Sequence, residues 1–438
     1  MEEYLNLLLE QIRCKKARPY IAEEMKGHIE EQILENIKSG MSKEEAEKEA
    51  ICDMGSPIET GILLDKIHRP RMAWELIGMI TIMSIIGIGI HFLIGNNVIA
   101  SSRFTLHTVI GLGMMFLVYY IDYSMIARYS KILAFMLNGF YLWILFYGEK
   151  VNGTIFNMNF AGFHISLFSV MLLYIPLYGA IIYQYYGTGY NGIIKSIAWM
   201  LIPIFITRAL PSFSLTVIFT ISMTAILTIA VCKKWFAVSK KKVIAWLWGI
   251  VLCIPCLGIV VIYKLRLLSD YYMERLSNIV FSGSEKSYIT KLLSSYLANS
   301  SIIGGGKEKI IGILPDFNTS YIIIYLIQQY GILMGIMVCC VLAVLIIKIF
   351  SICFKQKNQL GMIMGYGCGM VLLMNFIINI LENFRLLPLS QTFLPFVSAG
   401  GSDLIVCYML IGIILSIYRY KNIYPIHMDK IQNQLFSE

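Results

Sequence analysis

Residues 316–320 read Asp-Phe-Asn-Thr-Ser and lie directly before an apolar run that continues to Ile347. Asp316, Asn318 and Thr319 each carry a short side-chain oxygen that can accept hydrogen bonds from the first free N–H groups of a helix, so each is a candidate N-cap. The N-terminal end of a helix also attracts anions, phosphate groups included. Two interpretations follow: a phosphate-binding surface at a membrane boundary, or the ordinary polar cap of a membrane helix.

Residues 264–320 form the longest predicted loop. Loops of more than about 15 residues in a compact protein are usually functional or disordered. Apolar residues such as Leu292, Leu293 and Tyr296 predict amphipathic helices that lie on the membrane, rather than disorder. Three glycines at 304–306 precede the cation of Lys307, so this part of the loop could hold a diphosphate.

The cysteines and histidines predict neither a disulfide framework nor a metal site. Most of the 10 cysteines lie in apolar stretches, and none lies in residues 264–320. Cys253 and Cys256 match C-x-x-C, but their apolar surroundings favour packing over redox chemistry. His28 and His68 have no second pair of ligands at a suitable spacing.

The composition predicts a membrane protein, because 57% of the 438 residues are hydrophobic and only 14% are charged. A membrane-spanning helix needs about 20 apolar residues. No stretch alternates in the manner of a barrel strand, so the predicted fold class is all-α: a polytopic helical bundle of about ten spans. The ten stretches are residues 74–94, 104–121, 132–147, 165–183, 196–206, 213–232, 243–263, 321–347, 362–380 and 404–418.

The distribution of Lys and Arg predicts the orientation. Loops on the side of the two termini carry 15 Lys and Arg residues near the span ends, whereas the short loops on the other side carry 4. By the positive-inside rule, both termini are predicted to be cytoplasmic. Residues 423–438 form a cytoplasmic tail, and residues 264–320 lie outside the cell.

Residues 1–70 differ from the rest of the chain. They hold 15 acidic and 10 basic residues, and apolar residues recur at helical spacing, as in Ile21, Met25 and Ile29. Ser42 and Glu45 form the pattern of a capping box. This segment is predicted to be a small soluble helical domain rather than a signal peptide, since the first long apolar stretch begins at residue 74.

This N-terminal segment resembles the HAAS-type, or permease-prefix, domain that precedes bacterial membrane proteins. The resemblance rests on Ala17-Arg-Pro-Tyr-Ile, His28-Ile-Glu, the stretch 40–46, Met54-Gly-Ser-Pro and His68-Arg-Pro. It implies a cytoplasmic regulatory or interaction role and no chemistry.

Residues 71–422 resemble the SEDS family of FtsW, RodA and SpoVE. One family signature is matched in register by Asn379, Leu386, Leu387, Pro388, Leu394, Pro395, Phe396, Ser398, Gly400, Gly401 and Ser402. The other hallmark of the family is matched by Leu314, Pro315, Thr319, Ile322 and Gly331.

The resemblance implies a protein of the bacterial cytoplasmic membrane that takes part in peptidoglycan synthesis, in cell division or cell-shape control. Family members polymerise lipid II, the undecaprenyl-linked disaccharide-peptide, usually with a class B penicillin-binding transpeptidase as partner. The implied partners are therefore lipid II, that transpeptidase and the membrane, with no nucleic acid. The residues expected to bind substrate are Arg275, Lys307, Asn318, Thr319, Ser398, Gly400, Gly401 and Ser402.

The sequence departs from the family at its essential carboxylate. Ser320 stands where the family has Asp, and a serine hydroxyl cannot replace a carboxylate as base or metal ligand. The only cofactor that the resemblance suggests is a divalent cation. Asp316, four residues from Ser320, and Asp403, which follows the signature, are the candidate catalytic acids, and Glu382 lies on the same external face.

Three functions remain open at this point. The protein is a diverged glycan polymerase that uses another acid, a non-catalytic relative that binds lipid-linked precursor or a partner, or a transporter of that precursor. The stretches Phe163-His-Ile-Ser166 and Leu210-Pro-Ser-Phe-Ser214 stand where the family has Q-P-S-E and Q-P-D-L-G. The joint loss of these polar positions and of the Asp at position 320 favours the second. Only Asp122 and Glu382 border the spans, which gives little sign of the proton path a transporter would use.

Overall fold

The structure is a computed structural model that describes residues 1–94, 98–147, 149–151, 154–160, 163–207, 213–265, 288–306, 310–387 and 392–425. The chain divides into two compact units. The first comprises Met1–Ala73, Lys355–Met362 and Leu415–Glu438, and the second comprises Trp74–Phe354 and Ile363–Ile414.

The N-terminal part of the first unit contains four helices, in agreement with the helical prediction for residues 1–70. They are α1 (Glu2–Glu10), α2 (Arg18–Lys38), α3 (Lys43–Asp53) and α4 (Pro57–Ile67). Ser42 and Glu45 form the predicted capping box at the start of α3. Helix α1 packs on α4 at Gly61, where an added Cβ would lie 2.7 Å from the Leu8 carbonyl oxygen.

The C-terminal segment of the same unit packs against these helices. The Arg71 N–H donates to the Arg419 carbonyl oxygen at 3.2 Å. The rings of Tyr20 and Tyr424 meet edge to face, with centroids 5.6 Å apart. Lys16 lies over the Tyr420 ring, 4.9 Å from its centroid. The end of the last membrane helix is thus part of the unit that holds the N-terminal helices.

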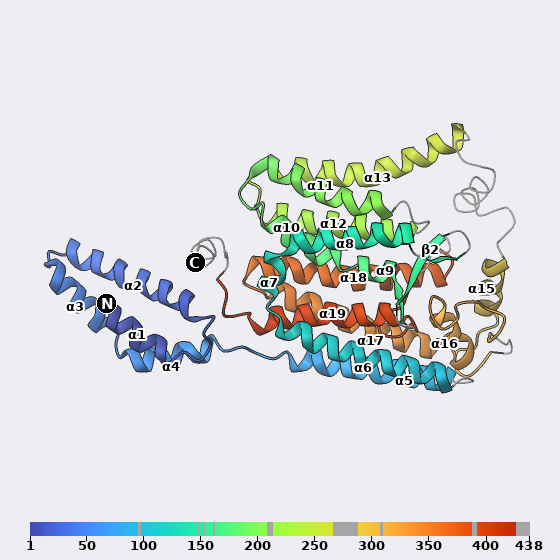
Figure 1. Ribbon diagram of the computed structural model, residues 1–438, viewed down its shortest axis with the longest axis horizontal. Helices are drawn as coiled ribbons and strands as arrows, with labels where there is room; N and C mark the ends of the chain where they lie inside the picture. The colour runs from blue at the N-terminus through green and yellow to red at the C-terminus, as the bar shows by residue number, and fades with distance from the viewer. Residues whose placement is uncertain are drawn as a thin grey trace. The chain divides into compact units, whose positions relative to one another are not determined.

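The bundle consists of long helices that lie side by side (Figure 1). Every one of the ten predicted spans contains a helix. Among the described residues, seven helices are long and apolar enough to cross a membrane, and two apolar segments, Ser130–Ile144 and Leu167–Tyr183, are shorter. The protein is therefore a multi-pass membrane protein. The helices are α5 (Trp74–Ile94), α6 (Val98–Tyr120), α7 (Tyr123–Arg128), α8 (Ser130–Tyr147), α9 (Leu167–Met171), α10 (Tyr174–Tyr183), α11 (Gly189–Thr207), α12 (Phe213–Cys232), α13 (Lys240–Leu265), α17 (Ile332–Phe354), α18 (Gln359–Asn383) and α19 (Gly401–Arg419).

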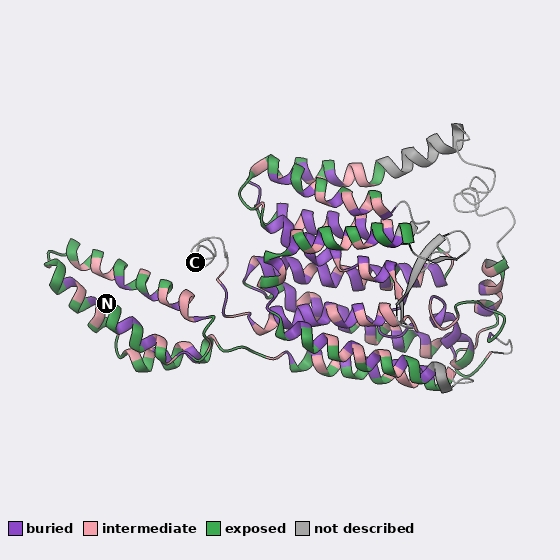
Figure 2. Ribbon diagram, in the orientation of Figure 1, coloured by how far each residue is buried: buried purple, intermediate pink, exposed green. Residues whose placement is uncertain are grey.

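The core of the bundle is formed mainly by α10, α18 and α19, whose ribbons are largely purple in Figure 2. Every residue of α10 is buried. Helices α5 and α6 keep exposed faces, with Ile85 at 64% and Val109 at 61% exposure. Apolar side chains on such faces suit contact with lipid, because the bilayer core is as apolar as the side chains themselves.

The structure contains a small sheet that the sequence analysis did not predict. Strands β1 (Glu149–Val151), β2 (Thr154–Phe160) and β3 (Phe163–Ser166) pair antiparallel in the order β1-β2-β3. Residues 156–160 alternate between apolar and polar types, and this period of two residues is typical of a strand. The predicted span 165–183 therefore begins as strand and continues as the separate helices α9 and α10.

The predicted single span 321–347 is also wrong. Gly331 divides it into α16 (Ile322–Tyr330) and α17. Gly331 has φ 97°, and an added Cβ would lie 2.7 Å from the Ile302 carbonyl oxygen, so both conformation and space require glycine. Helix α15 (Tyr288–Ala298) confirms a helix within the predicted long loop.

Candidate functional site

Two segments that are far apart in the sequence meet at the candidate site. One is residues 316–320, directly before α16, and the other is residues 392–400, directly before α19. The Ser398 hydroxyl donates to the Thr319 carbonyl oxygen at 2.7 Å. The Ala399 N–H donates to the Asn318 carbonyl oxygen at 2.9 Å. The structure therefore brings together Asn318, Thr319 and Ser398, which the sequence predicted as one site.

Two asparagines on the last turns of α18 hold the Ser320 main chain. The side-chain Nδ2 atoms of Asn379 and Asn383 each donate to the Ser320 carbonyl oxygen at 2.9 Å. The two residues are one helical turn apart and so lie on one face. Both are fully buried, and Ser320 is 8% exposed. Asn383 was missed by the sequence analysis, although its i, i+4 spacing from Asn379 was a usable signal.

Asp316 is exposed and has φ 52°, in the left-handed region that non-glycine residues seldom occupy. Its carbonyl oxygen accepts from the N–H groups of Thr319 and Tyr321, both at 3.1 Å. The predicted N-cap role is wrong for Asp316, Asn318 and Thr319, because the N-cap of α16 is Tyr321 and no side chain caps the helix there. The carboxylate of Asp316 thus stays available at the surface of this turn.

Asp403 lies on the first turn of α19 and accepts a hydrogen bond from the Ser169 hydroxyl of α9. Its neighbour Ser402 accepts from the Ser166 N–H at 3.0 Å. The carboxylate of Asp403 also packs on Gly400, where an added Cβ would collide with it. Asp403 therefore joins α19 to α9, whereas Asp316 is exposed on the turn before α16.

Gly401 marks a close approach to α6. An added Cβ at this position would lie 2.8 Å from the His107 ring. Gly400 and Gly401 thus have packing roles in the structure, and their part in substrate binding stays a prediction.

Arg275 and Lys307, two further predicted contacts to substrate, lie outside the described residues. Gly306, next to Lys307 in the sequence, donates its N–H to the Gln328 carbonyl oxygen at 2.6 Å. Within the described part of the chain, no group of three or more His, Cys, Asp or Glu side chains is arranged to hold a metal ion.

A family model for cell cycle proteins of the FtsW, RodA and SpoVE type matches residues 67–423. The chain belongs to this family. The match leaves out residues 1–66, so the resemblance of the N-terminal segment to a permease-prefix domain stays a prediction.

Curated relatives carry the name probable peptidoglycan glycosyltransferase FtsW. The protein of Enterococcus hirae is 32% identical over 132 residues, which is 29% of this chain and 33% of that protein. The protein of Bacillus subtilis is 30% identical over 132 residues, with the same two coverages. The match to these two relatives spans about a third of their length. The protein of Hydrogenovibrio crunogenus is 20% identical over 292 residues, which is 63% of this chain and 70% of that protein.

Solved structures confirm the fold of this FtsW/RodA/SpoVE family member. A chain from a peptidoglycan synthase complex that coordinates polymerization and crosslinking has a TM-score of 0.67 at 13% identity, over 80% of this chain and 99% of that chain. The rod shape determining protein RodA of Thermus thermophilus has a TM-score of 0.55 at 12% identity, over 80% and 97% of the two chains.

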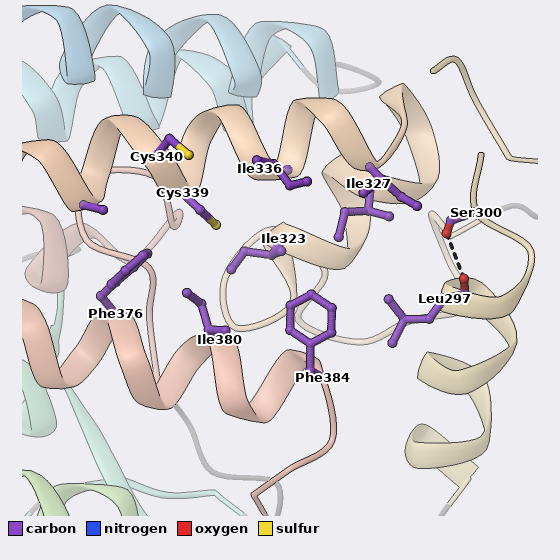
Figure 3. A pocket seen from close by; sticks show the side chains of 13 residues that line it. Leu297, Ser300, Ile323, Ile327, Ile336, Cys339, Cys340, Phe376, Ile380 and Phe384 are labelled. Carbon is purple, nitrogen blue, oxygen red and sulfur yellow. Dashed lines mark hydrogen bonds between the residues drawn. The ribbon is translucent and has the colours of Figure 1, made fainter. Parts of the chain in front are cut away.

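An apolar cavity of about 480 Å³ lies between α15, α16, α17 and α18 (Figure 3). Phe384, which follows Asn383, and Ile323, on the first turn of α16, both face it. The Ser300 hydroxyl in its wall donates to the Leu297 carbonyl oxygen at 2.8 Å. The lining therefore suits a hydrocarbon chain. The other lining residues are Ile327, Ile332, Gly335, Ile336, Cys339, Cys340, Ala343, Phe376 and Ile380.

Proposed function

We propose that this family member polymerises lipid II into glycan strands during cell wall synthesis. The observation that carries the proposal is the direct hydrogen bonding between the two family motifs, from Ser398 to Thr319 and from Ala399 to Asn318. Asparagine side chains from α18 fix the same junction. These buried contacts fix the position of the segment that carries the exposed Asp316, and fixed positions of reacting groups are a large part of catalysis.

In the proposed reaction, a sugar hydroxyl of one lipid II molecule attacks the anomeric carbon of the other. The bond from that carbon to the diphosphate breaks, undecaprenyl diphosphate leaves, and a base accepts the hydroxyl proton. Asp316 is the proposed base, because its carboxylate is exposed beside Asn318 and Thr319. Asp403 is the second candidate acid, although it already accepts from Ser169.

We include a divalent cation in the proposal, because the Asp316 carboxylate and the Asn318 amide offer the oxygen ligands that Mg²⁺ prefers. Such an ion would offset charge on the leaving diphosphate. EDTA is then expected to stop polymerisation, and excess Mg²⁺ to restore it.

The apolar cavity is the proposed site for the polyprenyl chain of the substrate. It contacts the same end of α18 that carries Asn379 and Asn383, and its lining is almost wholly apolar. The proposed partner is a class B penicillin-binding transpeptidase, which would crosslink the new strands. The proposed orientation, from the charge asymmetry of the loops, puts both termini in the cytoplasm and the candidate site outside.

A non-catalytic role is the second candidate. Two observations support it. The Ser320 side chain has no carboxylate, and the residue contributes its carbonyl oxygen, which accepts from Asn379. The Asp403 carboxylate already accepts from the Ser169 hydroxyl. In this role the protein binds lipid-linked precursor or a partner, and residues 1–70 report binding to the cytoplasm. Asp122 gives little support to the transport alternative. Its carboxylate caps α7, where it accepts a hydrogen bond from the Ser124 N–H at 2.9 Å.

The deciding experiment is lipid II polymerisation by the purified full chain in detergent, with a known family polymerase as positive control. Glycan product supports the polymerase. Absence of product, both alone and with added transpeptidase, favours the non-catalytic role.

A further inference from the structure

A buried carboxyl group lies next to the contact between residues 316–320 and residues 392–400. Glu382, on the last turn of α18, is 2% exposed. Its Oε2 accepts a hydrogen bond from the Thr392 hydroxyl at 2.5 Å. This contact ties the Thr392 hydroxyl to the last turn of α18.

Thr392 connects Glu382 to the asparagines. The Asn379 Nδ2 atom lies 3.4 Å from the Thr392 hydroxyl oxygen and 2.9 Å from the Ser320 carbonyl oxygen. Because the Thr392 proton goes to Glu382, the hydroxyl oxygen is left to accept from the amide. The Asn379 side chain must therefore point its NH₂ group toward Thr392 and Ser320.

The hydrogen bonds of this network follow one donor-to-acceptor order, from the Asn379 amide to the Thr392 hydroxyl and from that hydroxyl to Glu382. Asn383 continues the order, because its Nδ2 atom donates both to the Ser320 carbonyl oxygen at 2.9 Å and to the Asn379 carbonyl oxygen at 2.8 Å. A glutamine at position 382 has nearly the same shape but can also donate. The Thr392 hydroxyl would then be free to turn, and the Asn379 amide would lose one of its two acceptors and keep only the Ser320 carbonyl oxygen.

We propose that Glu382 is a positioning residue that orients the 316–320 segment for catalysis, through Thr392, Asn379 and the Ser320 carbonyl oxygen. This inference rests on the proposed polymerase function. The segment carries the exposed Asp316, and misplacement of a reacting group by about 1 Å can cost about 100-fold in rate. Glu382 itself is buried and makes no contact with substrate in this proposal.

The test compares Glu382→Gln, Thr392→Val and Thr392→Ser with the wild-type full chain. Glu382→Gln and Thr392→Val are expected to lower kcat for lipid II polymerisation by about 10- to 100-fold with KM unchanged. Thr392→Ser keeps the hydroxyl and is expected to keep the rate. Glu75→Gln is the matched control, because Glu75 lies on the first turn of the membrane helix α5 but is 73% exposed, in an ion pair with Lys348.

Hydrogen exchange of residues 314–321 is measured on the same samples, because it reports the position of the segment without requiring activity. Exchange is expected to be faster in Glu382→Gln and Thr392→Val than in the wild type, Thr392→Ser and Glu75→Gln. If the wild type polymerises lipid II and Glu382→Gln matches it in kcat and exchange, the positioning role is overturned while the polymerase function stands.

If the wild type makes no glycan, the proposed function fails, and the exchange data alone decide the positioning role. If Glu382→Gln does not fold, the comparison of Thr392→Val with Thr392→Ser decides in its place. Equal kcat and equal exchange in those two variants would overturn the inference.

Discussion

The Ser398 hydroxyl donates to the Thr319 carbonyl oxygen at 2.7 Å across a sequence separation of 79 residues. The same hydroxyl oxygen accepts from the Leu394 N–H at 2.7 Å. One side chain therefore fixes both the turn before α19 and its contact with the segment before α16. This explains in physical terms why the two motif segments form a single site.

Replacement of Ser398 by Ala should lower the stability of the bundle. The change leaves the Leu394 N–H and the Thr319 carbonyl oxygen without their partner, and a buried unsatisfied polar group costs about 1–3 kcal/mol. Thermal unfolding in detergent measures the loss. Ser294→Ala is the control, because the Ser294 hydroxyl donates to the Lys291 carbonyl oxygen within α15, and this hydrogen bond is exposed. Equal melting temperatures of the two variants would contradict a role for Ser398 in joining the segments before α16 and α19.

The two candidate acids should respond differently to loss of charge. Asp316→Asn is expected to lower lipid II polymerisation by about 10² to 10⁴-fold, because an exposed catalytic base is removed. Asp403→Asn keeps an oxygen that can accept from Ser169 and should affect melting and rate much less. Asp53→Asn, at an exposed position of α3, serves as the control. Retained activity in both Asp316→Asn and Asp403→Asn would exclude these residues as the base.

Much of the fold was predictable because spanning helices leave a strong local signal. Apolar stretches of about 20 residues mark most of the spans, and Ser42 with Glu45 marks the start of α3. The division at Gly331 was not predictable in this way. Its cause is a contact with the Ile302 carbonyl oxygen, which an apolar run does not reveal.

The candidate site was predictable only as a set of motif residues. Family signatures placed Thr319 and Ser398 in one site, and the structure shows their hydrogen bond. The i, i+4 spacing of Asn379 and Asn383 puts both on one face of α18, but neither the contact of Asn383 with the Ser320 carbonyl oxygen nor that of Asp403 with Ser169 follows from a motif. Such partners depend on how the helices pack, and helix packing is not encoded in local spacing.

Acid should destabilise the first unit through Asp65. Burial alone would raise the pKa of Asp65, but the Arg13 N–H at 2.9 Å and the guanidinium of Arg69 at 2.8 Å hold that pKa below its usual value. A folded-state pKa below the unfolded value of about 3.9 stabilises the fold above that pH, and the stabilisation is lost as pH falls through the folded-state pKa. Hydrogen exchange of α1 and α4 in the full chain, corrected for the intrinsic exchange rate at each pH, measures this loss of stability.

Asp65→Asn should remove this pH dependence and lower the stability of α1 and α4 near neutral pH by about 1.5–3 kcal/mol, since bonds to a charged group are lost. Asp53→Asn should behave as the wild type, because Asp53 is exposed. The assignment fails if Asp65→Asn keeps the acid sensitivity of the wild type.

A carboxylate at position 320 should compensate for the loss of Asp316. The Ser320 side chain is nearly buried, and its carbonyl oxygen is held by Asn379 and Asn383, so an aspartate there would start from a fixed main chain. In the Asp316→Asn background, Ser320→Asp is expected to raise the polymerisation rate at least about 10-fold by restoring a base. Ser320→Asn in the same background is the control, because it matches the size without the charge and should gain nothing. If both double variants stay inactive while melting as the wild type does, position 320 is not a place from which a base can act in this chain, and the non-catalytic role gains the stronger support.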